Sequence, residues 1–309
     1  MDNKYKGYLL VLGTAIISGF SIFINKYGVK ETDPYVFTFV KNLIASLPFL
    51  FLAIPYFKEI KKLNIREKLL FFAIAIIGGS IPFLFFFKGL TIASAANASF
   101  IHKTMFIYIA LFGLYFLKEK LNFISIVGFV ALIFGSLLFF NIQPGKLGIG
   151  ELYIFIATLM WAVEMLVSKK LLSKISPNLV SFSRMFLGSG IILSYLFITQ
   201  KAGLLVHLNN TQWLWLMIGG ILLFGYVFTF YRGLKVLSAA ESSAILTLGA
   251  PITALLTLGF QGKNLLPGQP VAVALIFLSL FIIIMGKDMV RACRELFNSS
   301  ASRRNSLEG

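Results

Sequence analysis

Two stretches of this chain, 144 residues apart, have nearly the same sequence. Residues 86–99 and 230–243 are identical at seven of their 14 positions. A second match, at a shift of 143, places Lys26, Pro34, Phe39, Lys41 and Ser46 on Lys169, Pro177, Phe182, Arg184 and Ser189. One copy therefore covers roughly residues 7–141 and the other roughly residues 150–286. Each copy contains five long apolar segments, and because five is odd, the two copies must cross a membrane in opposite directions. This predicts an inverted repeat.

The composition supports a membrane protein. Of the 309 residues, 58% are hydrophobic and only 13% are charged, whereas a soluble domain has about 25% charged residues. Apolar runs of about 18–24 residues are long enough to cross a hydrocarbon core of about 30 Å as α-helices. The sequence predicts ten such helices, at residues 8–28, 35–57, 69–87, 95–117, 121–140, 150–168, 176–199, 213–231, 240–260 and 268–286.

Lysine and arginine are unevenly distributed over the predicted loops. With the N-terminus in the cytoplasm, 19 of the 28 Lys and Arg lie on the cytoplasmic side, six on the outer side and three within spans. Cytoplasmic loops of membrane proteins carry such an excess, so we expect a multi-pass plasma-membrane protein with both termini in the cytoplasm. The net charge of +16 is therefore assigned to orientation and to contact with anionic lipid, not to nucleic-acid binding.

The predicted domain organisation follows from the repeat. Residues 1–143 form the first five-helix repeat, residues 144–288 the second, and residues 289–309 a polar, disordered cytoplasmic tail. One cysteine, Cys293, and two histidines, His102 and His207, are too few for a structural zinc site. There is no His-Glu-x-x-His motif and no nucleophile elbow. We therefore expect no metal, no cofactor and no enzymatic activity.

Several local features resemble the EamA-type ten-helix exporters of the drug/metabolite transporter superfamily. The features that carry the resemblance are Gly89-Leu90 and Gly233-Leu234, each followed by Ser-Ala-Ala, then Trp161 ahead of Lys169-Lys170, Pro251 in the ninth helix, and Leu117-Lys118-Glu119 followed by Gly128. In the second repeat Gln261-Gly262-Lys263 replaces the Leu-x-Glu signal. This departure favours a loop-capping role for Glu119 over a role in substrate handling.

The resemblance implies an all-α integral membrane protein in which ten transmembrane helices, as two inverted five-helix repeats, surround a central cavity. It also implies alternating access, in which one part of the bundle rocks against another. A polar metabolite that crosses hydrocarbon must exchange its hydration for a few polar groups inside the bundle. The candidate site residues are therefore the polar residues within the spans.

Four charged residues lie within predicted spans: Lys41, Lys103, Glu164 and Arg184. A charge at a helix centre costs roughly 2.5–3.5 kcal/mol on insertion scales. Lys103 is nearly central in its helix with no acid within a turn, so we expect it to contact the anionic group of a substrate. Glu164 and Arg184 share a depth that suits either a gating ion pair or substrate contact. Lys41, the repeat mate of Arg184, either binds substrate or has a structural role near a helix end.

Four uncharged candidates complete the predicted site. His102 adjoins Lys103 but projects about 100° away on a helix, which favours a packed, hydrogen-bonded histidine over a substrate contact. The aromatic residues Tyr108, Trp161 and Tyr226 each have a polar end that needs a partner inside a bundle. Three buried cations against one acid favour a substrate that bears a carboxylate or a phosphate. We therefore expect an exporter of small polar metabolites, above all amino acids or related zwitterions and anions.

Two other functions stay open. Residues 99–103, Ser-Phe-Ile-His-Lys, weakly resemble the fourth helix of plastid phosphate exchangers, which would make the substrate a sugar phosphate or nucleotide sugar. A non-transporting membrane scaffold or sensor is disfavoured by the cost of burying Lys103. Glu164 and His102 are the groups within the spans that could carry a coupling proton. Gly128, Ala131 and Gly135 allow close packing in a monomer or a weak dimer.

Overall fold

The computed structural model describes residues 3–119, 122–140, 148–260, 262 and 266–286, and it forms two compact units. Unit 1 (1–119 and 142–265) contains all but two of the described helices, and unit 2 (120–141 and 266–309) contains those two. Each unit therefore draws on both predicted repeats. The predicted boundary at residues 143 and 144 and the predicted tail lie outside the described residues.

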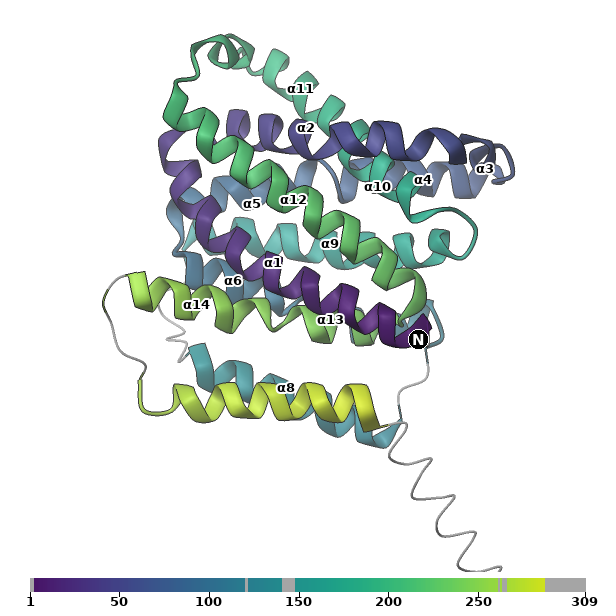
Figure 1. The fold of residues 1–309 in the computed structure, drawn as a ribbon, viewed down its shortest axis with the longest axis vertical. Helices are drawn as coiled ribbons and strands as arrows, with labels where there is room; N and C mark the ends of the chain where they lie inside the picture. The colour runs from purple at the N-terminus through teal and green to yellow at the C-terminus, as the bar shows by residue number, and fades with distance from the viewer. Residues whose placement is uncertain (1–2, 120–121, 141–147, 261, 263–265, 287–309) are drawn as a thin grey trace, which may run out of the picture. The chain divides into compact units, whose positions relative to one another are not determined.

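All regular structure in the described residues is helical (Figure 1). The elements of unit 1 are α1 (Asn3–Glu31), α2 (Pro34–Ala53), η1 (Ile54–Tyr56), α3 (Phe57–Lys61), α4 (Ile65–Ile77), α5 (Ile81–Ile92), α6 (Ala95–Lys103), α7 (Met105–Phe116), α9 (Ile149–Leu172), α10 (Pro177–Phe182), η3 (Ser183–Leu187), α11 (Gly188–Ile198), η4 (Ala202–His207), α12 (Asn210–Val236), α13 (Ala239–Leu246) and α14 (Gly249–Phe260). Unit 2 contains α8 (Phe123–Phe140) and the helix Gln269–Gly286.

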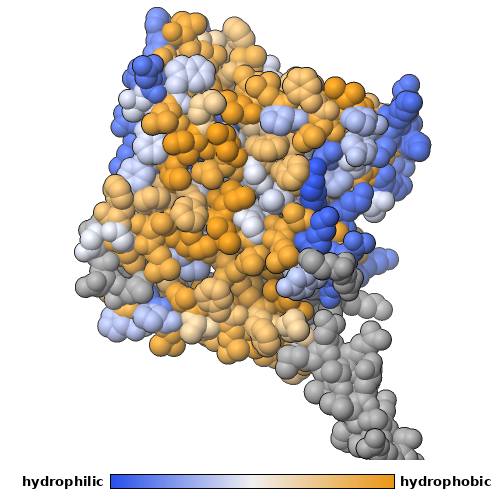
Figure 2. Space-filling view, in the orientation of Figure 1, coloured by the Kyte–Doolittle hydropathy of each residue, from blue (hydrophilic) through white to orange (hydrophobic). Residues whose placement is uncertain are grey.

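Nine helical stretches in the described residues are long and apolar enough to cross a membrane. Short elements join into single spans, so that α2 to α3, α4 with α5, and α6 with α7 each make one. The prediction of ten spans is met at nine places, and the fifth predicted span corresponds to α8, whose apolar stretch Phe123–Phe139 is shorter. Figure 2 shows hydrophobic side chains over the middle of α1 and α12, and hydrophilic ones gathered around α3. This distribution fits a bundle whose sides face lipid.

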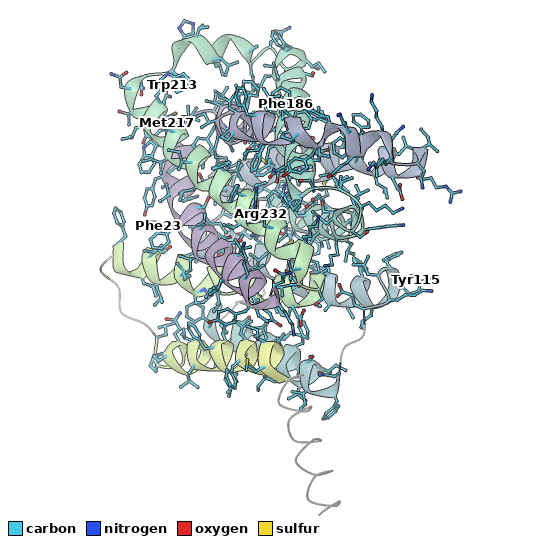
Figure 3. The ribbon with its side chains drawn as sticks, turned by 45° about the vertical axis from the view of Figure 1, so that its right-hand side comes forward. Phe23, Tyr115, Phe186, Trp213, Met217 and Arg232 are labelled. Atoms are coloured by element: carbon cyan, nitrogen blue, oxygen red, sulfur yellow. The ribbon has the colours of Figure 1, made fainter. Side chains whose placement is uncertain are left out.

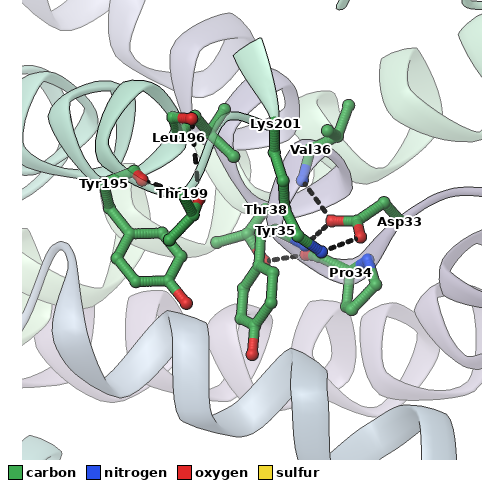
Figure 4. A network of polar contacts seen from close by, with 9 residues as sticks. All are labelled: Asp33, Pro34, Tyr35, Val36, Thr38, Tyr195, Leu196, Thr199 and Lys201. Carbon is green, nitrogen blue, oxygen red and sulfur yellow. Dashed lines mark hydrogen bonds and ion pairs between the residues drawn. The ribbon is translucent and has the colours of Figure 1, made fainter. Parts of the chain in front are cut away.

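Polar residues stabilise the helix ends of unit 1. Asp33 precedes α2, and its carboxylate accepts hydrogen bonds from the backbone N–H groups of Tyr35 and Val36 at 2.9 and 3.3 Å. The same carboxylate pairs with Lys201, which follows α11 (Figure 4). An acidic N-cap satisfies donors that the first turn leaves unpaired, and here it also joins the two repeats at one end of the bundle.

Matching lysines hold the ends of two other helices. Lys26 of α1 donates to the carbonyl oxygens of Leu90 at 2.6 Å and Ala93 at 2.5 Å, where α5 ends. Its repeat mate Lys169 of α9 donates to Leu234 at 2.8 Å and Leu237 at 2.5 Å, where α12 ends. We call these two arrangements the carbonyl clamps. Each one satisfies carbonyl groups that a helix C-terminus leaves without a partner.

The carbonyl clamps lie at opposite ends of unit 1. Lys26 is near the end of α1, whereas the clamp of Lys169 lies where α1 begins, because a Cβ built on Gly7 would lie 3.1 Å from Leu237 Cγ. The equivalent contacts of the two repeats therefore face opposite ways. This arrangement agrees with an inverted repeat.

The backbone between α4 and α5 packs against an irregular turn, η3, in the span Pro177–Ile198. Residues 78–80 interrupt the third span, and η3 is one π-helical turn within the span Pro177–Ile198. A Cβ built on Gly79 would lie 1.6 Å from the carbonyl oxygen of Arg184, and one on Gly188 would lie 2.7 Å from the Gly79 backbone. The two backbones therefore touch directly, which only glycine permits at such a distance. Arg184 is fixed in the bundle by this crossing.

Candidate functional site

A cavity lies within unit 1, between α1, α2, α5, α6, α9, η3 and α12. The cavity volume is about 60 Å³, or about 480 Å³ when all the space between the lining residues out to the open side is counted. Lys41 is seven residues into α2 and Phe87 is five residues from the end of α5, so the cavity is nearer the end of the bundle where α1 finishes. Its walls combine phenylalanine rings with a few polar groups, as is usual for small-molecule sites.

Lys41 presents its ammonium group to this cavity. The side chain is 1% exposed, and Nζ lies 3.7 Å from the ring centroid of Phe87 and 5.3 Å from that of Phe83. Over the residues that the structure describes, no oxygen accepts a hydrogen bond from this ammonium group and no carboxylate pairs with it. Attraction to ring faces offsets only part of the cost of removing a cation from water. The cavity thus contains a cation without an anion.

Glu164 and Arg184 form an ion pair next to the cavity, and Arg184 is the member of the pair that lines it. Arg184 Nη1 is 3.4 Å from Glu164 Oε2 and 3.1 Å from the hydroxyl of Tyr231. The Tyr231 hydroxyl donates to Glu164 Oε1 at 2.6 Å, and Ser168 donates to the same oxygen. All four side chains are buried, and we call them the acid cluster. Because three donors surround the carboxylate, its negative charge is well compensated despite burial.

His102, Trp161 and Tyr226 line the aromatic part of the cavity. The Trp161 indole N–H donates to the carbonyl oxygen of Gly78 at 2.9 Å, which holds the ring against the break between α4 and α5. The His102 ring lies 5.1 Å from Trp161 and 5.6 Å from Phe86, centroid to centroid. Its Nδ1 has no hydrogen-bond partner among the described residues. His102 is therefore packed between rings, with Nδ1 buried.

Lys103 lies behind the cavity wall. Its ammonium donates to the hydroxyl of Ser18 at 2.7 Å, and a Cβ built on Gly249 would lie 3.1 Å from Nζ. Ser18 lines the cavity, whereas Lys103 does not. The structure thus separates Lys103 from Lys41 and His102, and direct contact of Lys103 with a substrate stays a prediction.

Tyr108 and Glu119 also lie outside the cavity. Tyr108, on α7, packs against Phe155 with ring centroids 6.1 Å apart. The Glu119 carboxylate accepts hydrogen bonds from the backbone N–H groups of Ala239 at 2.8 Å and Ala240 at 3.2 Å, at the start of α13. Glu119 therefore caps a helix N-terminus, in agreement with the predicted capping role.

One group of cavity residues was not predicted. Ser18, Ser21 and Asn25 of α1 all line the cavity, and Tyr231 completes the acid cluster. The first three recur at intervals of three and four residues, which puts polar side chains on one face of an apolar helix. That spacing was the available signal. Among the described residues, no cluster of three or more His, Cys, Asp or Glu could hold a metal ion.

Comparison with known proteins connects this architecture to transporters. The chain is 27% identical over 305 residues to the riboflavin transporter ImpX of Fusobacterium nucleatum, with 92% of this chain and 98% of the relative covered. It is 24% identical over 257 residues to the uncharacterized transporter YoaV of Bacillus subtilis, with 81% and 86% covered. An uncharacterized transporter of Archaeoglobus fulgidus is 29% identical over 201 residues, with 62% and 67% covered.

The fold and the repeat are found in known proteins as well. A crystal structure of a protein with 14% sequence identity superposes with a TM-score of 0.68, and the match covers 92% of this chain and 97% of the other. The model of the EamA-like transporter family matches twice, over residues 5–141 and residues 148–285. This multi-pass membrane protein therefore belongs to the EamA-like transporter family, as the sequence analysis predicted.

Proposed function

We propose that this protein is a secondary transporter that exports a small polar metabolite bearing a carboxylate, such as an amino acid or a related anion, across the plasma membrane. Transport proceeds by alternating access, with the substrate bound in the cavity of unit 1. The observation that carries the proposal is the ammonium group of Lys41, which is buried at the cavity wall with no anion among the described residues. A substrate that brings a negative charge removes this electrostatic cost as it binds.

The other cavity groups have distinct parts in this proposal. Trp161, Tyr226 and His102 enclose the substrate on the aromatic side. Lys103 acts through Ser18, whose hydroxyl it holds in the cavity wall. The acid cluster, which includes Glu164 and Arg184, forms the floor toward the end where α1 begins. It serves as the gate on that side.

The distribution of lysine and arginine orients the molecule. The end where α1 begins carries the larger number of positive charges and faces the cytoplasm. On this side Glu67 pairs with Lys174, and the Ser176 backbone N–H donates to Glu59 at 2.6 Å, so links between the repeats lie beneath the acid cluster. The cavity lies toward the outer side, which corresponds to a state that gives access from outside.

A flavin or another planar heteroaromatic compound is a second candidate substrate. Two observations favour it: the rings that surround the cavity, and the relative named a riboflavin transporter, which matches over nearly its whole length. A ring system of this kind would stack on Trp161 or Phe86 and needs no anion beside Lys41. The two candidates therefore differ in their dependence on Lys41.

The test is ligand binding by the purified protein. We expect one compound from a panel of amino acids, sugar phosphates, nucleotide sugars and riboflavin to raise the unfolding temperature, because a ligand that binds the folded state stabilises it. If it bears a carboxylate, Lys41→Met should weaken its binding by roughly 10- to 100-fold, the effect of losing one charge-assisted hydrogen bond. Lys30→Met, at an exposed site near the end of α1, is the matched control and should bind as the wild type does.

Three results would contradict the proposal of a carboxylate substrate. Unchanged affinity in Lys41→Met would remove Lys41 from the site. Riboflavin as the single stabilising compound would favour the second candidate. Stabilisation by sugar phosphates alone would favour the exchanger alternative.

A further inference from the structure

The acid cluster has a counterpart in the first repeat, position by position. A shift of 143 residues relates Glu164 to Ser21, Ser168 to Asn25 and Arg184 to Lys41, and a shift of 144 relates Tyr231 to Phe87. These are the shifts at which the two copies match in sequence. The four counterpart residues, Ser21, Asn25, Lys41 and Phe87, all line the cavity. The place that the Glu164 side chain occupies in the second repeat is therefore open to the cavity in the first. We call this place, with its four surrounding positions, the corner of each repeat.

The second repeat shows what this corner can bind. There the carboxylate of Glu164 accepts from the hydroxyls of Ser168 and Tyr231 and pairs with the guanidinium of Arg184. The carboxylate group is anchored to α9, but its oxygens are bound by groups from three different elements. The corner of the second repeat is thus a carboxylate site whose ligand is covalently part of the chain.

The first repeat contains the equivalent corner without a carboxylate and without the tyrosine hydroxyl, because Phe87 stands in the place of Tyr231. Serine replaces the glutamate at position 21, and the cation remains as Lys41. Asn25 Nδ2 donates to the Ser21 hydroxyl at 3.0 Å, as Ser168 does to Glu164 one helical turn earlier. Asn25 is 4% exposed, and its Oδ1 has no hydrogen-bond partner among the described residues. A buried amide group and a buried ammonium group thus both lack a partner at this wall.

The unpartnered oxygen of Asn25 and the aliphatic stem of Lys41 both lie against Gly219 of α12. A Cβ built on Gly219 of α12 would lie 3.0 Å from Asn25 Oδ1 and 3.0 Å from Lys41 Cδ. Rotating the Asn25 amide by 180° exchanges its N and O atoms, so the side chain can accept from Ser21 and offer an N–H donor to an anion. Lys41 and the Asn25 amide then provide donors to one small anion, and the Ser21 hydroxyl, which donates to Asn25, holds the amide in that orientation.

We propose that Ser21, Asn25 and Lys41 form a subsite for a carboxylate group of the transported substrate. The substrate carboxylate takes, beside Lys41, the place that the Glu164 carboxylate takes beside Arg184. This inference rests on the proposed function and makes it specific. A carboxylate fits better than a phosphate dianion, because the subsite has one cation and its counterpart holds one single negative charge.

The subsite can be tested without knowledge of the substrate by supplying the carboxylate from position 21. Ser21→Glu should pair with Lys41, whereas Ser21→Gln has nearly the same size and no charge. In full-length protein purified in lipid nanodiscs, we expect the Tm of Ser21→Glu to exceed that of Ser21→Gln by about 2–4 °C. In a Lys41→Met background the order should reverse, because the new carboxylate is then buried without a cation.

A second pair of variants keeps the test decisive if both changes at position 21 prevent folding. Lys41→Met should maintain or raise the Tm, because it removes a buried cation that lacks a partner. Arg184→Met should lower the Tm, because it leaves Glu164 unpaired. If Lys41→Met lowers the Tm as much as Arg184→Met does, Lys41 is a structural residue and the subsite is overturned. Equal Tm values of Ser21→Glu and Ser21→Gln in both backgrounds would overturn it as well.

These outcomes are separate from those of the proposed function. A carboxylate ligand whose binding persists in Ser21→Glu would overturn the subsite and leave the transporter proposal intact. Conversely, wild-type protein that transports no carboxylate would defeat the proposed function. The Tm comparison would still report whether the corner binds an anion.

Discussion

The two repeats share the contacts that hold helices together and differ in the contacts that face the cavity. Each first helix has a lysine, Lys26 or Lys169, that donates to carbonyl oxygens at the end of the third helix of the same repeat. The buried cation of each second helix is treated differently. Arg184 forms an ion pair with Glu164 of the same repeat. Lys41 has no carboxylate partner among the described residues. The difference teaches that the contacts shared by both repeats hold helix ends, whereas the departures from symmetry lie at the cavity.

The largest expected effect comes from breaking the acid cluster. Glu164→Gln leaves the buried guanidinium of Arg184 without its anion, and loss of one partner of a buried ion pair costs about 3–5 kcal/mol. We expect a low folded yield and a lower unfolding temperature. The double change Glu164→Gln with Arg184→Gln should recover part of the loss. A double variant as poor as the sum of the two single variants would mean that the pair contributes nothing as a pair.

Variants of the two clamp lysines test whether the contacts that both repeats share stabilise the fold equally. Lys169→Met removes the donor to Leu234 and Leu237, and leaving such carbonyl groups unpaired costs about 1–3 kcal/mol. Lys26→Met should cost a similar amount at the opposite end of unit 1. Lys170→Met, which changes an exposed neighbour, is the matched control and should unfold at the wild-type temperature. A large effect for one clamp lysine and none for the other would show that the two clamps are not equivalent.

Lys103 sharpens the comparison because its repeat mate is neutral. Lys103 holds Ser18, while Thr247 at the equivalent position donates to Ala244 within its own helix. Lys103→Ala should weaken substrate binding by about tenfold, or about 1.4 kcal/mol, and reduce transport. Lys103→Arg should restore only part, because a planar guanidinium differs from a compact ammonium.

Ser18→Ala distinguishes the two ways in which Lys103 could act. If Lys103 works through Ser18, binding by Ser18→Ala should be weakened to a similar degree. Wild-type binding by Ser18→Ala together with weak binding by Lys103→Ala would point to direct contact with the substrate. Unchanged binding by both variants would leave Lys103 with a role in packing.

The smallest effect is expected from a test of orientation. Lys201→Cys removes a partly exposed pair with Asp33, worth about 0–1 kcal/mol, so the protein should stay folded. In a Cys293→Ser background, a membrane-impermeant maleimide added to intact cells should label position 201 but not Lys61→Cys. Labelling at position 61 alone would reverse the assignment of the two ends, and with it the side on which each carbonyl clamp lies. Lys146 is also expected outside, although it lies outside the described residues.

The sequence predicted the class of fold because several independent features lead to the same conclusion. Apolar runs, the odd number of segments per copy and the matched motifs each point to spanning helices in repeated order. The break at residues 78–80 was not located, since the run of residues 69–87 has no charged residue on either side of it. Gly79 in this break lies against the backbone of Arg184, in the turn formed by Ser183–Leu187. A contact between distant segments leaves no periodic signal in either one.

The lining of the cavity was predicted in part, whereas its role as a binding site stays a prediction. Lys41, Trp161, Tyr226 and His102 were identified as polar or amphipathic residues within apolar spans, and they line one cavity. Lys103 satisfied the same criterion and lies one hydrogen bond behind the wall. Depth along a helix can be counted from the sequence, but the direction in which a side chain points depends on packing. The serines of α1 were missed because a hydroxyl costs little in an apolar helix, where it can bond to a preceding carbonyl group.

The crossing of Gly79 and Gly188 also restricts how this chain can vary. Each glycine is in contact with the backbone of the other segment, so the first side-chain carbon at either position would collide with main-chain atoms that cannot rotate away. A single replacement therefore cannot be compensated by a change at the opposite glycine, because that residue has no atom left to remove. In a library with both codons randomised, functional clones should have glycine at both positions. Positions 79 and 188 should therefore tolerate fewer substitutions than the apolar positions around them.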